Sequence, residues 1–110
     1  MTRTFIQTTE FTKSWCELGL SDEKLRALEN EILRNPKSGS VIRGTGKLRK
    51  LRLAFEDRGK SGSVRVCYVD FLSKGTIYLI TVFSKNQKDN LTLNEKNNIK
   101  KIIEILECSL

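Results

Sequence analysis

The sequence predicts a single α+β domain spanning residues 1–110, in which an antiparallel sheet carries its helices on one side. Three observations predict it: a strand followed by two short amphipathic helices, then three strands in succession, then one closing helix. A chain of 110 residues has room for one compact core. Its composition, 38% hydrophobic and 30% charged, is typical of a folded domain and not of a disordered chain.

The first third of the chain predicts a strand at residues 3–7 and then a tightly joined helical hairpin. The first helix is capped by Thr8 or Thr9 and stopped by Gly19, and its apolar stripe comprises Phe11, Trp15 and Leu18. The second begins at Ser21 and ends at an Asn-Pro pair, and its apolar stripe comprises Leu25, Leu28, Ile32 and Leu33.

Three strands are predicted next, over residues 48–55, 64–71 and 76–83. Polar or glycine-rich connections precede and separate them, at residues 37–46, 56–62 and 73–75. In the first strand, apolar side chains alternate with Lys50 and Arg52, which therefore share one face. The third strand is the most apolar, which predicts a central place in the sheet. A last helix begins at Thr92 with a capping box to Glu95, and its apolar stripe comprises Ile99, Ile102, Ile103, Leu106 and Leu110.

The residues that the sequence lacks exclude several chemistries. There is no histidine, which removes histidine-based nucleophilic catalysis and the usual nitrogen ligands of metals. Cys16, Cys67 and Cys108 are too widely spaced for a zinc site or a disulfide framework, so neither a metal nor a cofactor is expected. No glycine-rich phosphate loop occurs, and no apolar stretch approaches the roughly 20 residues of a membrane span. The N-terminus lacks the apolar core of a secretory signal, which predicts a cytoplasmic protein.

The net charge of +7 is concentrated in one segment of the chain. Residues 43–65 carry eight basic and two acidic side chains, whereas the flanking segments are close to neutral. Such a patch is the electrostatic footprint of a polyanionic partner, most simply a nucleic acid. The plainer interpretation is a solvated basic face that serves solubility, but it does not explain why the rest of the chain is nearly neutral.

Part of this charge is placed where it can act on a phosphodiester. Lys50 and Arg52 share a strand face, Arg65 can reach that face from the next strand, and Lys85 follows the last strand. Arginine suits phosphate oxygens and the extra negative charge that develops when an RNA 2′-hydroxyl attacks the adjacent phosphorus. Crowded cations favour a neutral lysine, so Lys50 is a candidate base. The alternation alone leaves catalysis and simple RNA binding equally open.

Several stretches of the sequence together resemble the RelE/HigB toxins of bacterial toxin–antitoxin modules. They are F-T-K-S-W-C-E-L-G-L-S-D-E-K-L, L-R-K-L-R-L-A, G-K-S-G-S-V-R-V-C-Y, I-Y-L-I-T-V-F-S-K-N and K-D-N-L-T-L-N-E. The resemblance covers nearly the whole chain in the same order of elements. It implies a RelE-like fold and a ribosome-dependent endoribonuclease (an mRNA interferase), which cuts messages in the ribosomal A site without a metal and so inhibits translation.

The resemblance also implies catalytic residues and partners. The catalytic set comprises Lys50, Arg52, Arg65 and Lys85, with Arg65 ending a G-x-x-R turn. This chain lacks the C-terminal tyrosine or histidine that could serve as a further catalytic group, so Lys85 is the first candidate for the proton donor and Lys88 the second. The expected partners are the ribosome, mRNA and a cognate antitoxin from an adjacent gene, with DNA binding by that antitoxin left open.

Other residues are expected to bind RNA or the ribosome without taking part in the chemistry. They are Arg43, Lys47, Arg49, Arg58, Lys60, Lys88 and Phe83, whose ring could stack on an mRNA base. Trp15, Tyr68 and Tyr78 are instead expected to pack in the core. Two other functions stay open: a gyrase-inhibiting toxin of the ParE type, which shares the fold, and a non-catalytic RNA-binding domain. The dense strand cations favour the nuclease over the ParE type.

Overall fold

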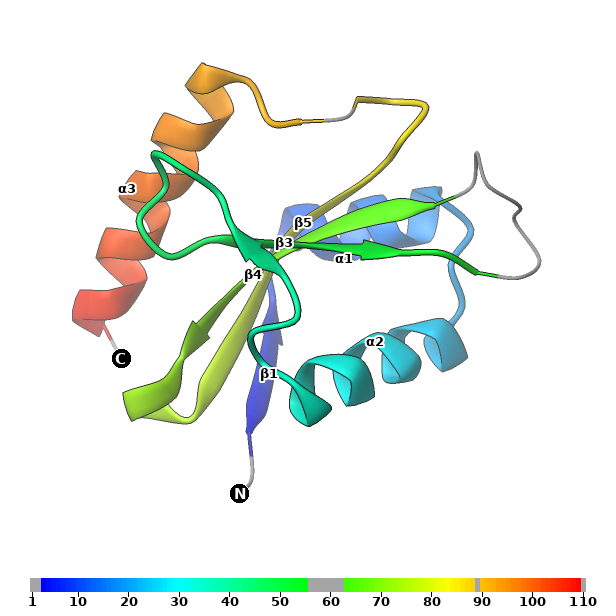
Figure 1. The fold of residues 1–110 in the computed structure, drawn as a ribbon, viewed down its shortest axis with the longest axis horizontal. Helices are drawn as coiled ribbons and strands as arrows, with labels where there is room; N and C mark the ends of the chain where they lie inside the picture. Colours follow the sequence, from blue (N-terminus) through cyan, green and yellow to red (C-terminus); the bar gives the residue numbers. More distant parts are fainter. Residues whose placement is uncertain (1–2, 56–62, 89, 110) are drawn as a thin grey trace.

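The computed structural model describes residues 3–55, 63–88 and 90–109 as one sheet with helices on both of its faces (Figure 1). The strands are β1 (Thr4–Gln7), β2 (Ser40–Val41), β3 (Arg49–Leu53), β4 (Val64–Phe71) and β5 (Thr76–Ser84). The helices are α1 (Thr9–Glu17), α2 (Asp22–Arg34) and α3 (Leu93–Ser109). Within the described residues no helix has both the length and the apolar character needed to cross a membrane.

The five strands lie in the order β1-β5-β4-β3-β2, so the predicted central place of β5 is confirmed. The pairs from β2 to β5 are antiparallel, but β1 runs parallel to β5, which corrects the prediction of a wholly antiparallel sheet. Apolar alternation carries no information on strand direction, and β1 reaches β5 only after both hairpin helices and three strands have intervened. The predicted loop at residues 37–46 contains β2, which is too short to produce a periodic pattern.

Helices cover both faces of the sheet, and the prediction that they pack on one side is wrong. Helices α1 and α2 share one apolar cluster with Val66 and Tyr68 of β4. Helix α3 shares a second cluster with Cys67 and Val69, the residues that alternate with them. Both faces of β4 and β5 are apolar, and a strand that is apolar on both faces needs cover on both.

Side-chain hydroxyls begin all three helices as predicted. Thr8 caps α1 by accepting from the Phe11 N–H at 3.0 Å, and Ser21 caps α2. In the apolar stripes, Trp15 is buried as expected, but Leu33 is 43% exposed and Ile102 is 42% exposed. Leu33 follows the buried Ile32, and Ile102 precedes the buried Ile103. Adjacent side chains on a helix point about 100° apart, so only one residue of each pair faces the sheet. Leu110 lies outside the described residues.

Candidate functional site

The strand register gathers three of the predicted catalytic cations on the sheet face that α3 covers. Arg52 of β3 lies opposite Arg65 of β4, and Lys50 lies opposite Cys67. Directly opposed residues of antiparallel strands project to the same face, so Lys50, Arg52 and Arg65 share a face as the alternation predicted. Arg65 in turn lies opposite Phe83 of β5. Two parallel rows therefore cross the sheet, one from Arg52 through Arg65 to Phe83 and one through Lys50 and Cys67.

Hydrogen bonds fix the ends of two of these side chains. The Lys50 ammonium donates to Asn90 Oδ1 at 2.8 Å, although 40 residues separate the two in the sequence. Arg65 Nη1 donates to Ser63 Oγ at 3.0 Å. The Lys85 backbone N–H donates to the Ser63 carbonyl at 3.2 Å, which sets the exposed Lys85 at the strand end beside the same serine. Ser63 thus links Arg65 to the segment that carries Lys85.

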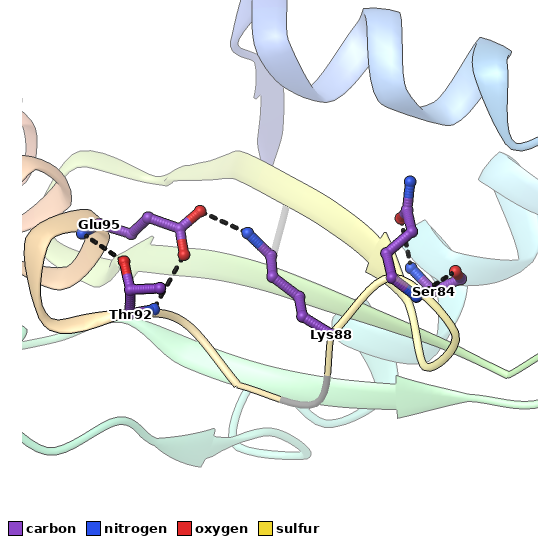
Figure 2. Close-up of polar contacts among 5 residues, drawn as sticks. Ser84, Lys88, Thr92 and Glu95 are labelled. Atoms are coloured by element: carbon purple, nitrogen blue, oxygen red, sulfur yellow. Dashed lines mark hydrogen bonds and ion pairs between the residues drawn. The ribbon is translucent and has the colours of Figure 1, made fainter.

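Lys88 reaches back over the sheet from the segment between β5 and α3 (Figure 2). Its ammonium lies 5.1 Å from the centroid of the Phe83 ring and forms an ion pair with Glu95. Glu95 Oε1 accepts from the Thr92 N–H at 2.8 Å, while the Glu95 N–H donates to Thr92 Oγ1 at 3.1 Å, which confirms the predicted capping box. The hydrogen bond from Lys88, followed by that from the Thr92 N–H, lowers the pKa of the Glu95 carboxyl below its ordinary value, so this carboxylate is ionised near neutral pH.

Phe83 does not present the stacking surface that the sequence suggested. Its side chain is 3% exposed and packs in the α3 cluster, beneath the Lys88 ammonium. The alternation of β5 sends this residue to the α3 side of the sheet, where helix and loop cover it. In this conformation the ring is part of the floor of the site, not a platform for an mRNA base.

The other cations assigned to RNA binding are not gathered with the catalytic set. Arg43 is exposed in the turn after β2, and Lys47 forms an ion pair with Glu107 near the C-terminal end of α3. Arg49 projects from the opposite face of β3, and its Nη1 donates to the Gly39 carbonyl at 2.7 Å. Arg58 and Lys60 lie outside the described residues.

The sequence interpretation missed two residues that contact the predicted site, Asn90 and Glu95. Glu95 had a signal, because the T-x-x-E pattern was recognised, but only its capping role was read from it. Asn90 had none, because its contact with Lys50 depends on how the segment before α3 folds back. Within the described part of the chain, no three histidine, cysteine, aspartate or glutamate side chains are grouped so that they could hold a metal ion.

Cys67 forms part of the floor between the cations. Burial raises the pKa of its thiol to about 12, although the charges of Lys50 and Lys88 act in the opposite direction. Cys16 and Cys108 are exposed free thiols.

Cys67 is therefore expected to be inert in the folded protein, while Cys16 and Cys108 react, because only a thiolate attacks a disulfide reagent. An aromatic disulfide reagent near pH 8 should titrate two thiols per chain in buffer and three in denaturant. Rapid reaction of all three thiols in the folded protein would contradict the buried placement of Cys67.

Comparison with known proteins agrees with this fold. Residues 2–109 match the family described as the RelE toxin of the RelE/RelB toxin–antitoxin system. The structure of an E. coli RelE double mutant in the free state is similar, with a TM-score of 0.58 and 20% identity over 80% of this chain and 88% of that chain. The intact E. coli RelBE toxin–antitoxin complex gives a TM-score of 0.55 and 21% identity over 74% of this chain and 94% of that chain. The isolated E. coli RelE toxin gives a TM-score of 0.54 and 20% identity over 92% of this chain and 99% of that chain.

At these identities the structural likeness bears on the fold alone, which is that of a small α+β domain. The family match spans almost the whole chain. The chain belongs to the RelE toxin family of toxin–antitoxin systems.

Proposed function

We propose that this chain is an endoribonuclease that cuts mRNA on the ribosome and so inhibits translation in the cytoplasm. The observation that carries the proposal is the register that sets Arg52 opposite Arg65 with Lys50 on the same face. Three cations on one sheet face favour a phosphodiester substrate, because two guanidinium groups and an ammonium can bind its oxygens together.

The chemistry proposed for these residues is an attack within the RNA itself. Lys50, the candidate base, takes the proton of a 2′-hydroxyl, whose oxygen attacks the adjacent phosphorus. Arg52 and Arg65 stabilise the extra negative charge of the pentacoordinate transition state. The bond from phosphorus to the 5′-oxygen breaks, a 2′,3′-cyclic phosphate forms, and a cation protonates the departing oxygen, with Lys85 as the sequence's first candidate. The scheme needs no metal ion, since protein cations supply the charge.

The test is to induce the protein in bacteria and to map RNA 5′ ends and DNA breaks in the same cultures. The proposal predicts new 5′ ends within translated codons and no DNA breaks that depend on gyrase. Gyrase-dependent breaks without new RNA ends would instead identify a ParE-type toxin. Growth without either lesion would favour a non-catalytic RNA-binding domain.

We also propose a protein antitoxin as the partner of this chain, encoded in an adjacent gene. Support comes from the family and from the similar E. coli RelBE structure, which is that of a toxin–antitoxin complex. A nuclease with an open basic face would be lethal without such a partner, and acidic segments would complement the net charge of +7. Co-expression of the neighbouring gene should restore growth, and its product should co-purify with this chain. A neighbouring product that neither binds nor protects would leave the partner proposal without support.

A further inference from the structure

We infer that Lys88, and not Lys85, is the proton donor of the reaction, and that Glu95 is the residue that positions it. This inference rests on the proposed endoribonuclease function and names a role that the sequence interpretation left open. It assigns to Glu95, a helix-capping residue, a second task in the site.

The first argument is the place of the Lys88 ammonium relative to the cation row. Neighbouring strands lie about 5 Å apart, so Arg52, Arg65 and Phe83 form a continuous row across the sheet. The Lys88 ammonium lies over the last member of that row, at 5.1 Å from the ring centroid. A phosphate bound at Arg65 would therefore have Lys88 on its β5 side.

The second argument is that the candidate base and the candidate acid approach from opposite sides. The Lys50 side chain comes from β3, on one side of β4, and the Lys88 ammonium lies over Phe83 of β5, on the other side. Lys50 lies opposite Cys67 on β4, and Phe83, beneath Lys88, lies opposite Arg65, so the two lysines reach adjacent rows of the same sheet face. An in-line displacement needs this arrangement, because the attacking and leaving oxygens lie on opposite sides of phosphorus.

The third argument is the contrast between the two lysines. Lys85 is an exposed residue whose contact with the site passes through its backbone, whereas the Lys88 side chain is 33% exposed and makes two directed contacts, with Phe83 and Glu95. A proton donor must be held within hydrogen-bonding reach of the oxygen that it protonates. The Lys88 ammonium is held in one place because its partner Glu95 belongs to the first turn of α3.

In the proposed step, Lys88 gives one proton to the leaving oxygen. The bond between phosphorus and the 5′-oxygen breaks, and its electron pair stays on that oxygen. One N–H bond of the Lys88 ammonium breaks, the proton moves to the 5′-oxygen to give the free hydroxyl, and Lys88 is left as a neutral amine. Lys50 holds the proton of the 2′-hydroxyl, and exchange with water restores both lysines.

The variant Glu95→Gln separates the two tasks of Glu95. Glutamine also serves in capping boxes, so the bond to the Thr92 N–H is retained while the ion pair with Lys88 is lost. We expect single-turnover cleavage of ribosome-bound mRNA at saturating toxin to fall about 10-fold to 10²-fold, since Lys88 loses its alignment. Affinity for the ribosome should stay equal or rise, because a negative charge has been removed. Glu107→Gln is the matched control. Glu107 lies on the same helix as Glu95, and its replacement breaks the ion pair with Lys47 but should leave the cleavage rate unchanged.

The donor is identified with an mRNA that carries sulfur in place of the bridging 5′-oxygen at the cut site. A thiolate leaves without a proton, so this substrate bypasses the acid. Lys88→Gln should cleave normal mRNA about 10²-fold to 10³-fold more slowly than the unaltered protein does. It should cleave the sulfur substrate at nearly the same rate as the unaltered protein. Combining Lys88→Gln with Glu95→Gln should add no further loss, because Glu95 acts through Lys88.

Each outcome decides a different question. An unaltered protein that fails to cut ribosome-bound mRNA overturns the proposed function and this inference with it. Cleavage by Glu95→Gln at or above the unaltered rate shows that the carboxylate only competes with the substrate phosphate, which overturns the positioning role. If sulfur rescues Lys85→Gln and does not rescue Lys88→Gln, Lys85 is the donor and the inference is wrong.

Discussion

Replacement of Arg65 by alanine is expected to lower the rate of mRNA cleavage on the ribosome about 10²-fold to 10³-fold and to abolish growth inhibition. Arg65 lies in the middle of the row that joins Arg52 to Phe83. Its guanidinium is therefore the group that we expect to stabilise the negative charge that develops on the phosphate in the transition state. The loss should appear in the single-turnover rate at saturating toxin, because an interaction that is stronger in the transition state than in the bound substrate raises the rate of the chemical step.

The fold should survive this substitution. Arg65 is half-buried on the face of β4 that α3 covers, and its neighbours Val64 and Val66 are buried on the opposite face. Circular dichroism and thermal unfolding check the fold, and primer extension on stalled ribosomes measures the cut. Arg26→Ala, an exposed arginine of α2 on the far side of the sheet, controls for loss of charge and should cut at the unaltered rate. A folded Arg65→Ala protein with undiminished cleavage would remove Arg65 from the active site.

Sequence reasoning succeeded where the signal is local. β4 covers the predicted residues 64–71, because a polar connection precedes this apolar run and a Ser-Lys-Gly turn follows it in the sequence. The helix starts at Thr8, Ser21 and Thr92 were recognisable because a hydroxyl before a helix satisfies its free N–H groups. The shared face of Lys50 and Arg52 follows from strand geometry alone. Residue periodicity was thus enough to predict most of the helices and strands and the strand that bears Lys50 and Arg52.

The remaining features depend on contacts between distant parts of the chain. The parallel direction of β1, the two-sided helix cover and the two-residue β2 each depend on which element is the neighbour, and periodicity does not encode that. The same holds for the site. Lys50 meets Asn90 and Lys88 turns back to Glu95 only because the segment after β5 folds over the sheet face before α3 begins. Phe83 was misjudged for this reason, since its covering residues lie after it in the chain.

Cleavage is expected to require the ribosome, and naked RNA should be cut negligibly at physiological salt. Proteins that hold single-stranded RNA unaided rely on exposed rings, and base stacking contributes about 1–3 kcal/mol per base. Phe83, the aromatic residue opposite Arg65, is 3% exposed beneath Lys88. The cations can bind a phosphate but provide little to orient the ribose whose 2′-hydroxyl must attack.

Alignment must therefore come from the partner that holds the codon. Misplacement of the reacting atoms by about 1 Å can cost on the order of 10²-fold in rate, and a ribosome that fixes the message in the A site removes that loss. The measurement compares one message, free and on stalled ribosomes, at equal toxin concentration and in the same buffer. Cleavage on the ribosome should also weaken steeply with added salt if, as the sequence predicts, the basic residues of segment 43–65 contact RNA phosphates. Equal cleavage of the free and the ribosome-bound message would mean that the sheet face orients its own substrate, and the ribosome-dependent mechanism would then have to be given up.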